Sequence, residues 1–124
     1  MGRYYDGDIE GKFWFAIQGS NAGDRFGVQG QTPNYLEYYF DKSNLDDIKN
    51  EVENIKNTLG IYKEKIDDFF NMGRTYTHEQ LADFLKVDIE KCRHLLSEYA
   101  DLELGEKILK CVEQNGSCEF RAEL

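Results

Sequence analysis

The side chains best suited to nucleophilic or metal chemistry are three cysteines and two histidines. Cys92, Cys111 and Cys118 form no C-x-x-C pair, so the sequence predicts neither a zinc site nor a disulfide framework. Cys92 and His94 are two positions apart and face different sides of a helix, which argues against a nucleophile pair. No serine lies in a G-x-S-x-G setting. We expect buried thiols, no enzyme activity, and neither metal nor cofactor.

A run of carboxylates near the N-terminus resembles the start of a calcium loop. Asp6, Asp8 and Glu10 are spaced two apart around a glycine. A complete loop needs a bidentate glutamate about a dozen residues from its first ligand, where this chain has Ala16 and Ile17. The sequence therefore predicts a polar turn that leads into a strand.

Residues 77–96 read THEQLADFLKVDIEKCRHLL, the outline of a helix-turn-helix. The helix that would enter a DNA groove opens with Asp88-Ile-Glu-Lys, and its carboxylates would be repelled by phosphates. Lys86, Lys91 and Arg93 are the nearby bases. We expect a plain helical hairpin, with a helix-turn-helix transcriptional regulator as the alternative.

The charge of the chain argues against nucleic acid as a direct partner. It has 24 acidic and 15 basic side chains and a net charge of −9. DNA binding draws affinity from Lys and Arg that neutralise phosphates, so we expect no direct binding of duplex DNA. Residues 75–124 hold 11 acids and 6 bases, and we predict a partner-binding face on the third and fourth helices, or an ordinary solvated surface. The predicted face consists of Glu79, Asp83, Asp88, Glu90, Glu98 and Asp101.

Chain length and hydropathy indicate the number of domains and argue against a membrane-spanning protein. A chain of 124 residues with 40% hydrophobic and 14% aromatic side chains fits one domain over residues 1–124. No apolar run approaches the roughly 18 residues of a membrane span, and the start lacks the apolar stretch of a signal peptide. We expect a soluble, cytoplasmic protein that does not bind membranes.

Strands are predicted at both ends of the chain. Residues 12–18 and 35–40 are rich in aromatic side chains, and residues 25–28 form a candidate short returning strand. The last residues alternate between apolar and polar, as in a half-buried strand. The apolar set is Cys118, Phe120, Ala122 and Leu124. Because this strand needs a partner sheet, we expect the two ends of the chain to pair.

The middle of the chain has the periodicity of helices. Apolar residues recur at spacings of three and four over residues 45–59, and a second helix should end near Gly73. A capping box of Thr77 and Gln80 starts a third helix, and Asp88 caps a fourth. A last helix should stop at Gly116. The predicted fold class is α+β, with a small antiparallel sheet of N-terminal strands plus the C-terminal strand packed against four to five helices.

Aromatic side chains gather around the predicted sheet. They are Tyr4, Tyr5, Trp14, Tyr35, Tyr38 and Tyr39. Because strand side chains alternate, one of Tyr38 and Tyr39 must face away from the core. Exposed tyrosines beside carboxylates suit an interface, either in a homodimer or with a foreign protein.

The opening segment GRYYDGDIEGKFWFAIQ, residues 2–18, resembles the start of small proteins encoded by phages and prophages. The resemblance implies a mobile-element origin, where compact acidic domains often inhibit host machinery. Anti-CRISPR proteins that imitate nucleic acid are among them. Together with the acidic net charge, the resemblance predicts a phage-type inhibitor or adaptor that binds a basic, nucleic-acid-handling host protein or nucleoprotein complex.

Overall fold

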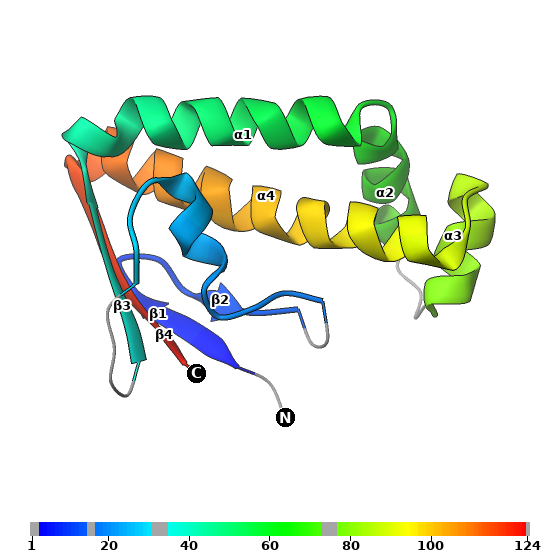
Figure 1. Cartoon of the computed structure of the whole chain (residues 1–124), viewed down its shortest axis with the longest axis horizontal. Coiled ribbons are helices and arrows are strands. Elements are labelled where there is room, and N and C mark those ends of the chain that lie inside the picture. Colours follow the sequence, from blue (N-terminus) through cyan, green and yellow to red (C-terminus); the bar gives the residue numbers. More distant parts are fainter. Residues whose placement is uncertain (1–2, 15–16, 31–34, 73–76, 124) are drawn as a thin grey trace.

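The computed structural model describes residues 3–14, 17–30, 35–72 and 77–123 (Figure 1). Within them the strands are β1 (Tyr4–Gly7), β2 (Gly11–Lys12), β3 (Tyr35–Asp41) and β4 (Ser117–Glu123). The α-helices are α1 (Leu45–Leu59), α2 (Tyr62–Asn71), α3 (His78–Leu85) and α4 (Ile89–Asn115). Two short 3₁₀ helices are η1 (Ala22–Phe26) and η2 (Lys42–Asn44). The predicted α+β fold class is confirmed.

The sheet joins the two ends of the chain. Its described strands are antiparallel in the order β2-β1-β4-β3, so the C-terminal strand is central. The apolar alternation of β4 buries Cys118, Phe120 and Ala122 on the side that faces the helices. Phe120 stacks on Tyr38 of β3 with 5.0 Å between ring centroids. The predicted pairing of the chain ends is confirmed, while Leu124 lies outside the described residues.

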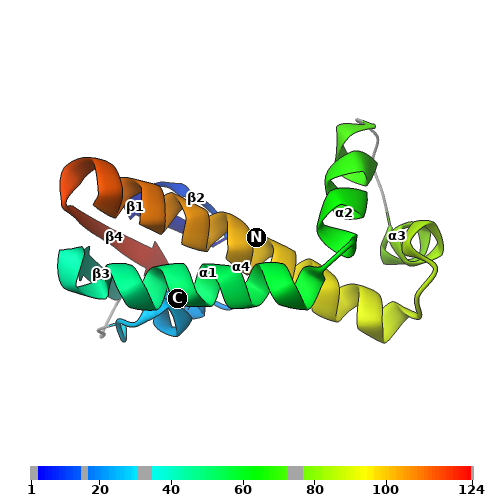
Figure 2. The same cartoon turned by 90° about the horizontal axis from the view of Figure 1, so that it is seen from above.

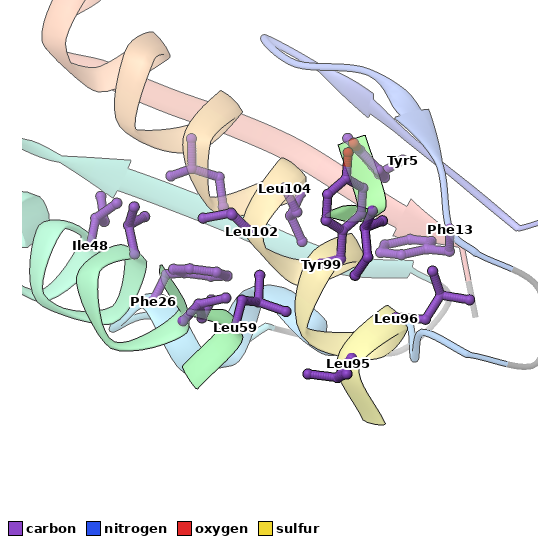
Figure 3. Close-up of a cluster of buried hydrophobic side chains, with 14 of the residues drawn as sticks. Tyr5, Phe13, Phe26, Ile48, Leu59, Leu95, Leu96, Tyr99, Leu102 and Leu104 are labelled. Atoms are coloured by element: carbon purple, nitrogen blue, oxygen red, sulfur yellow. The ribbon is translucent and has the colours of Figure 1, made fainter. Parts of the chain in front are cut away.

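Helices α1 and α4 run side by side in opposite directions and cover the inner side of the sheet (Figures 1 and 2). The predicted apolar positions of α1 are buried, including Ile48 and Leu59, and they belong to the same core cluster as α4 residues such as Leu95 and Leu102 (Figure 3). Helices α2 and α3 lie at the far end of this pair, away from β3 and β4 (Figures 1 and 2). Over the described residues, none of the helices is long and apolar enough to cross a membrane.

Helix α4 replaces two predicted helices. The fourth and last helices of the prediction are one continuous helix of 27 residues. Gly105, in its middle, is buried against Phe26 of η1, and a Cβ at Gly105 would lie 2.4 Å from Cε1 of that ring. Glycine is therefore present here for close packing rather than for a break in the helix.

The strand prediction for residues 12–18 is wrong beyond Lys12 in the described part of that segment. The backbone turns at Trp14, whose carbonyl accepts hydrogen bonds from the N–H groups of Ile17 (3.1 Å) and Gln18 (2.9 Å). The indole of Trp14 packs edge-on against Phe70 and Tyr99, with centroids 5.7 and 6.0 Å away. Packing of the aromatic side chain against α2 and α4 has overridden the local strand propensity. Residues 15–16 are outside the described residues.

Two other predictions for the N-terminal segment are corrected. Residues 25–28 do not form a returning strand, because η1 turns the chain so that the side chain of Phe26 is fully buried. The predicted polar turn at residues 6–10 starts only after Gly7, because Asp6 and Gly7 belong to β1. Asp8 then prolongs the pairing: its N–H donates to the carbonyl of Glu119 at 2.7 Å. The predicted helix end near Gly73 lies outside the described residues.

Candidate functional site

The six acidic residues of the predicted partner-binding face separate into two groups. Glu79, Asp83, Asp88 and Glu90 are exposed at the corner where α3 meets α4. Glu98 and Asp101 lie about two turns or more further along α4, and both carboxylates bind Arg25 within the protein. The structure therefore does not bring the six side chains onto one face.

Arg25 is the centre of an ion-pair cluster that joins η1 to two helices. Its Nε donates to Glu51 of α1 at 2.6 Å, and its Nη1 donates to Glu98 at 2.6 Å and to Asp101 at 2.7 Å. Gln18 donates from Nε2 to the other oxygen of Asp101 at 2.8 Å. Burial would lower the pKa of Arg25, but the three carboxylates together raise it well above its ordinary value. These contacts hold the N-terminal segment on the α1–α4 pair.

The raised pKa of Asp101 shows that burial of its carboxylate in this cluster disfavours the charged form. Burial raises the pKa above its ordinary value, although the hydrogen bonds from Arg25 and Gln18 act in the opposite direction. Neighbouring Glu98 adds repulsion that also raises it. Asp101 is therefore a carboxylate engaged inside the fold rather than one presented to a partner.

The α3–α4 corner has the geometry that the helix-turn-helix outline predicts. Thr77 and Gln80 form the predicted capping box, and Lys86 ends α3 in a left-handed conformation with φ 59°. Asp88 caps α4 by accepting from the N–H of Lys91 at 2.8 Å. One of the four exposed carboxylates is thus part of a helix cap. The sequence had predicted this cap as well as a binding role for Asp88, and the structure confirms the cap.

The corner mixes charges and apolar side chains. Its four carboxylates are interspersed with three basic residues, Lys86, Lys91 and Arg93, all exposed. Phe84 and Ile89 are also exposed there, by 39% and 37%. The corner is therefore only weakly acidic as a surface.

A second acidic surface lies on the side of the sheet that faces away from the helices. We define this outer face by the exposed, alternating side chains of β1, β3 and β4. They are Tyr4, Asp6, Glu37, Tyr39, Glu119 and Arg121. Tyr4 and Tyr39 are each 52% exposed, which confirms that one of the adjacent Tyr38 and Tyr39 faces outward.

Strand register sets the neighbours on the outer face. Arg121 lies opposite Asp6 on one side and Glu37 on the other, and its Nη2 is 3.9 Å from Oδ2 of Asp6. Tyr39 lies opposite Glu119. Each strand shows its own alternation in the sequence, but the register that makes these pairs does not follow from it.

A hollow of about 350 Å³ opens beside these pairs. Its walls come from β3, β4 and the segment after η1. The lining residues are Val28, Gln29, Glu37, Tyr38, Tyr39, Glu119, Phe120 and Arg121. Carboxylates and an exposed tyrosine ring around one hollow are suited to binding a cationic group.

Several other titratable groups are engaged in the fold. Tyr99 of α4 donates to Asp67 of α2 at 2.5 Å, which ties the two helices together, and Lys63 within α2 donates to the same carboxylate at 2.8 Å. The predicted burial of the thiols is confirmed, and burial raises the pKa of Cys92. In the part of the chain that the structure describes, no group of three or more His, Cys, Asp or Glu side chains is placed to hold a metal ion.

Comparison with known proteins does not add to these observations. No family model, curated protein or solved structure matches the chain. What the protein does is therefore inferred from its side chains and surfaces.

Proposed function

We propose that the protein is a binding module that engages a basic protein partner through the outer face of its sheet. The observation that carries this proposal is the combination of Glu37 and Glu119 with the exposed ring of Tyr39 around an open hollow. Asp6 adds a third exposed carboxylate to the same face of the sheet. Tyrosine is enriched in protein interfaces, and charge complementarity raises the rate and specificity of association.

The partner class that fits best is a protein that handles nucleic acid. Such proteins expose Lys and Arg where phosphates bind, and a chain with net charge −9 can place carboxylates at those positions. Together with the phage-like opening segment, this favours an inhibitor of a basic host protein or nucleoprotein complex, in the manner of anti-CRISPR proteins that imitate nucleic acid. On this proposal the protein acts by occupying a site rather than by catalysis.

The outer face is a better candidate than the α3–α4 corner for two reasons. The defined outer face has three acidic side chains and one basic side chain, whereas the corner has four acids interspersed with three bases. The outer face also borders a hollow, in which a partner's side chain can be surrounded by contacts.

A helix-turn-helix regulator is the second candidate, supported by the capped α3 and its tight turn into α4. Against it, the first turn of α4 presents Asp88 and Glu90, which oppose phosphates. A homodimer through the outer face is a further outcome that solution measurements of mass distinguish from a foreign partner.

The experiment is a capture from nuclease-treated bacterial lysate with two charge-matched variants. The outer-face variant is Glu37→Lys with Glu119→Lys, and the corner variant is Glu79→Lys with Asp83→Lys. Each changes the net charge by the same amount. The first pair belongs to β3 and β4, which lie at the opposite end of the molecule from α3, which carries the second pair (Figures 1 and 2). Asp88 is left intact because it caps α4.

A basic protein captured by the wild type should be lost with the outer-face variant and retained with the corner variant. Added nucleic acid should compete for it, and capture should weaken as salt rises, because exposed charges are screened. Equal capture by the wild type and the outer-face variant would contradict the proposal. Loss with the corner variant alone would move the binding surface to α3 and α4.

A further inference from the structure

We infer that the hollow on the outer face binds the guanidinium group of an arginine side chain. This inference rests on the proposed function, because it names the group of the basic partner that the hollow receives. The carboxylates of Glu37 and Glu119 make no ion pair or hydrogen bond with any other described residue, although both line the hollow. Their charge is therefore available to a ligand.

The register places these carboxylates at a suitable separation. Glu37 lies opposite Arg121, and Glu119 is two residues before Arg121 on β4, so Glu37 and Glu119 are diagonal neighbours on one face. Diagonal neighbours in an antiparallel pair are roughly 7–8 Å apart, and their Cβ atoms are somewhat closer. Two glutamates at this spacing can both reach a planar cation that lies between them.

Tyr39 provides the surface on which the cation would stack. It lies directly opposite Glu119, lines the hollow and is 52% exposed. A guanidinium stacks on an aromatic ring while its N–H groups donate in the plane to carboxylates. A lysine ammonium can satisfy one carboxylate but neither stacks as a plane nor donates in a bidentate way. The arrangement therefore favours arginine over lysine.

The presence of Arg121 in the lining does not make the hollow basic. Arg121 lies between Asp6 and Glu37 on the neighbouring strands, with its Nη2 at 3.9 Å from Asp6. The charged side chains that line the hollow are the two carboxylates of Glu37 and Glu119 and the one guanidinium of Arg121. The charged lining of the hollow therefore keeps an excess of negative charge.

The test is a titration of ¹⁵N-labelled protein with two matched peptides, Ac-Gly-Arg-Gly-NH₂ and Ac-Gly-Lys-Gly-NH₂, followed by NMR. The arginine peptide should shift the amide signals of Glu37, Tyr39 and Glu119, and the lysine peptide should bind about five-fold more weakly. Glu119→Gln and Tyr39→Leu should each weaken the arginine peptide several-fold. Glu79→Gln, at the opposite end of the molecule, is the matched control and should have no effect.

Equal binding of both peptides, or shifts spread over the surface, would overturn the inference. So would unchanged affinity in Glu119→Gln, whose exposed side chain can be replaced without touching the core. Should a variant lose its folded spectrum, the two titrations of the wild type still decide the question. The lysate capture tests the proposed function separately: non-selective peptide binding with loss of capture in the outer-face variant refutes the arginine hollow alone.

Discussion

Replacing Arg25 by glutamine should destabilise the protein by much more than the loss of an ordinary surface charge. The side chain of Arg25 is 28% exposed, and its partners Glu51, Glu98 and Asp101 are 21%, 14% and 13% exposed. Without the guanidinium, three partly buried carboxylates would face one another. Breaking a fully buried ion pair costs about 3–5 kcal/mol, and the partial exposure reduces our expectation to about 2–3 kcal/mol.

The loss should depend on pH in a defined direction. In the folded protein the pKa of Asp101 is already raised, chiefly by burial. Removing Arg25 takes away a contact that lowers this pKa. Asp101 therefore binds its proton more tightly in the folded variant than in the unfolded chain. For such a group, stability falls as pH rises through the folded pKa. The deficit in the free energy of unfolding should be largest at pH 7 and shrink toward pH 5.

Urea denaturation followed by circular dichroism at pH 7 and pH 5 measures both quantities. Arg121→Gln is the matched control, because its side chain is 53% exposed and its ion pair with Asp6 should contribute about 0–1 kcal/mol. A deficit for Arg25→Gln below about 1 kcal/mol at pH 7, or one that is the same at both pH values, would refute the structural role assigned to the cluster.

Gly105→Ala should lower the free energy of unfolding in urea melts, because the new Cβ would lie 2.4 Å from Cε1 of Phe26 and overpacking costs about 1–3 kcal/mol. This cost should exceed the helix preference of alanine over glycine, which is about 1 kcal/mol. A more stable variant would contradict this packing. Deleting residues 117–124 should abolish cooperative thermal unfolding, because it removes the central strand and buried Phe120; an unchanged Tm would show that β4 is dispensable. The protein should not bind a DNA duplex at physiological salt in anisotropy titrations. Saturable binding that weakens steeply with salt would favour the helix-turn-helix regulator instead.

Local signals were sufficient for part of this fold. The spacing of apolar residues predicted α1, and the capping box of Thr77 and Gln80 predicted the start of α3. Alternation predicted β4 and its burial. Each signal depends on side chains within a few residues of one another, where backbone geometry sets which of them share a face.

The candidate site depended on contacts that local signals do not carry. Arg25 meets Glu98 and Asp101 across 73 and 76 residues of sequence, so two carboxylates that look exposed on a helical wheel are engaged in the fold. The hollow likewise needs the register that sets Glu37 and Tyr39 beside β4. The amino-acid sequence thus determined α1, the start of α3, the buried alternation of β4 and the acidic charge. Only the tertiary structure decided which carboxylates are neutralised internally and which face solvent, because charge pairing and strand register arise from packing between distant segments.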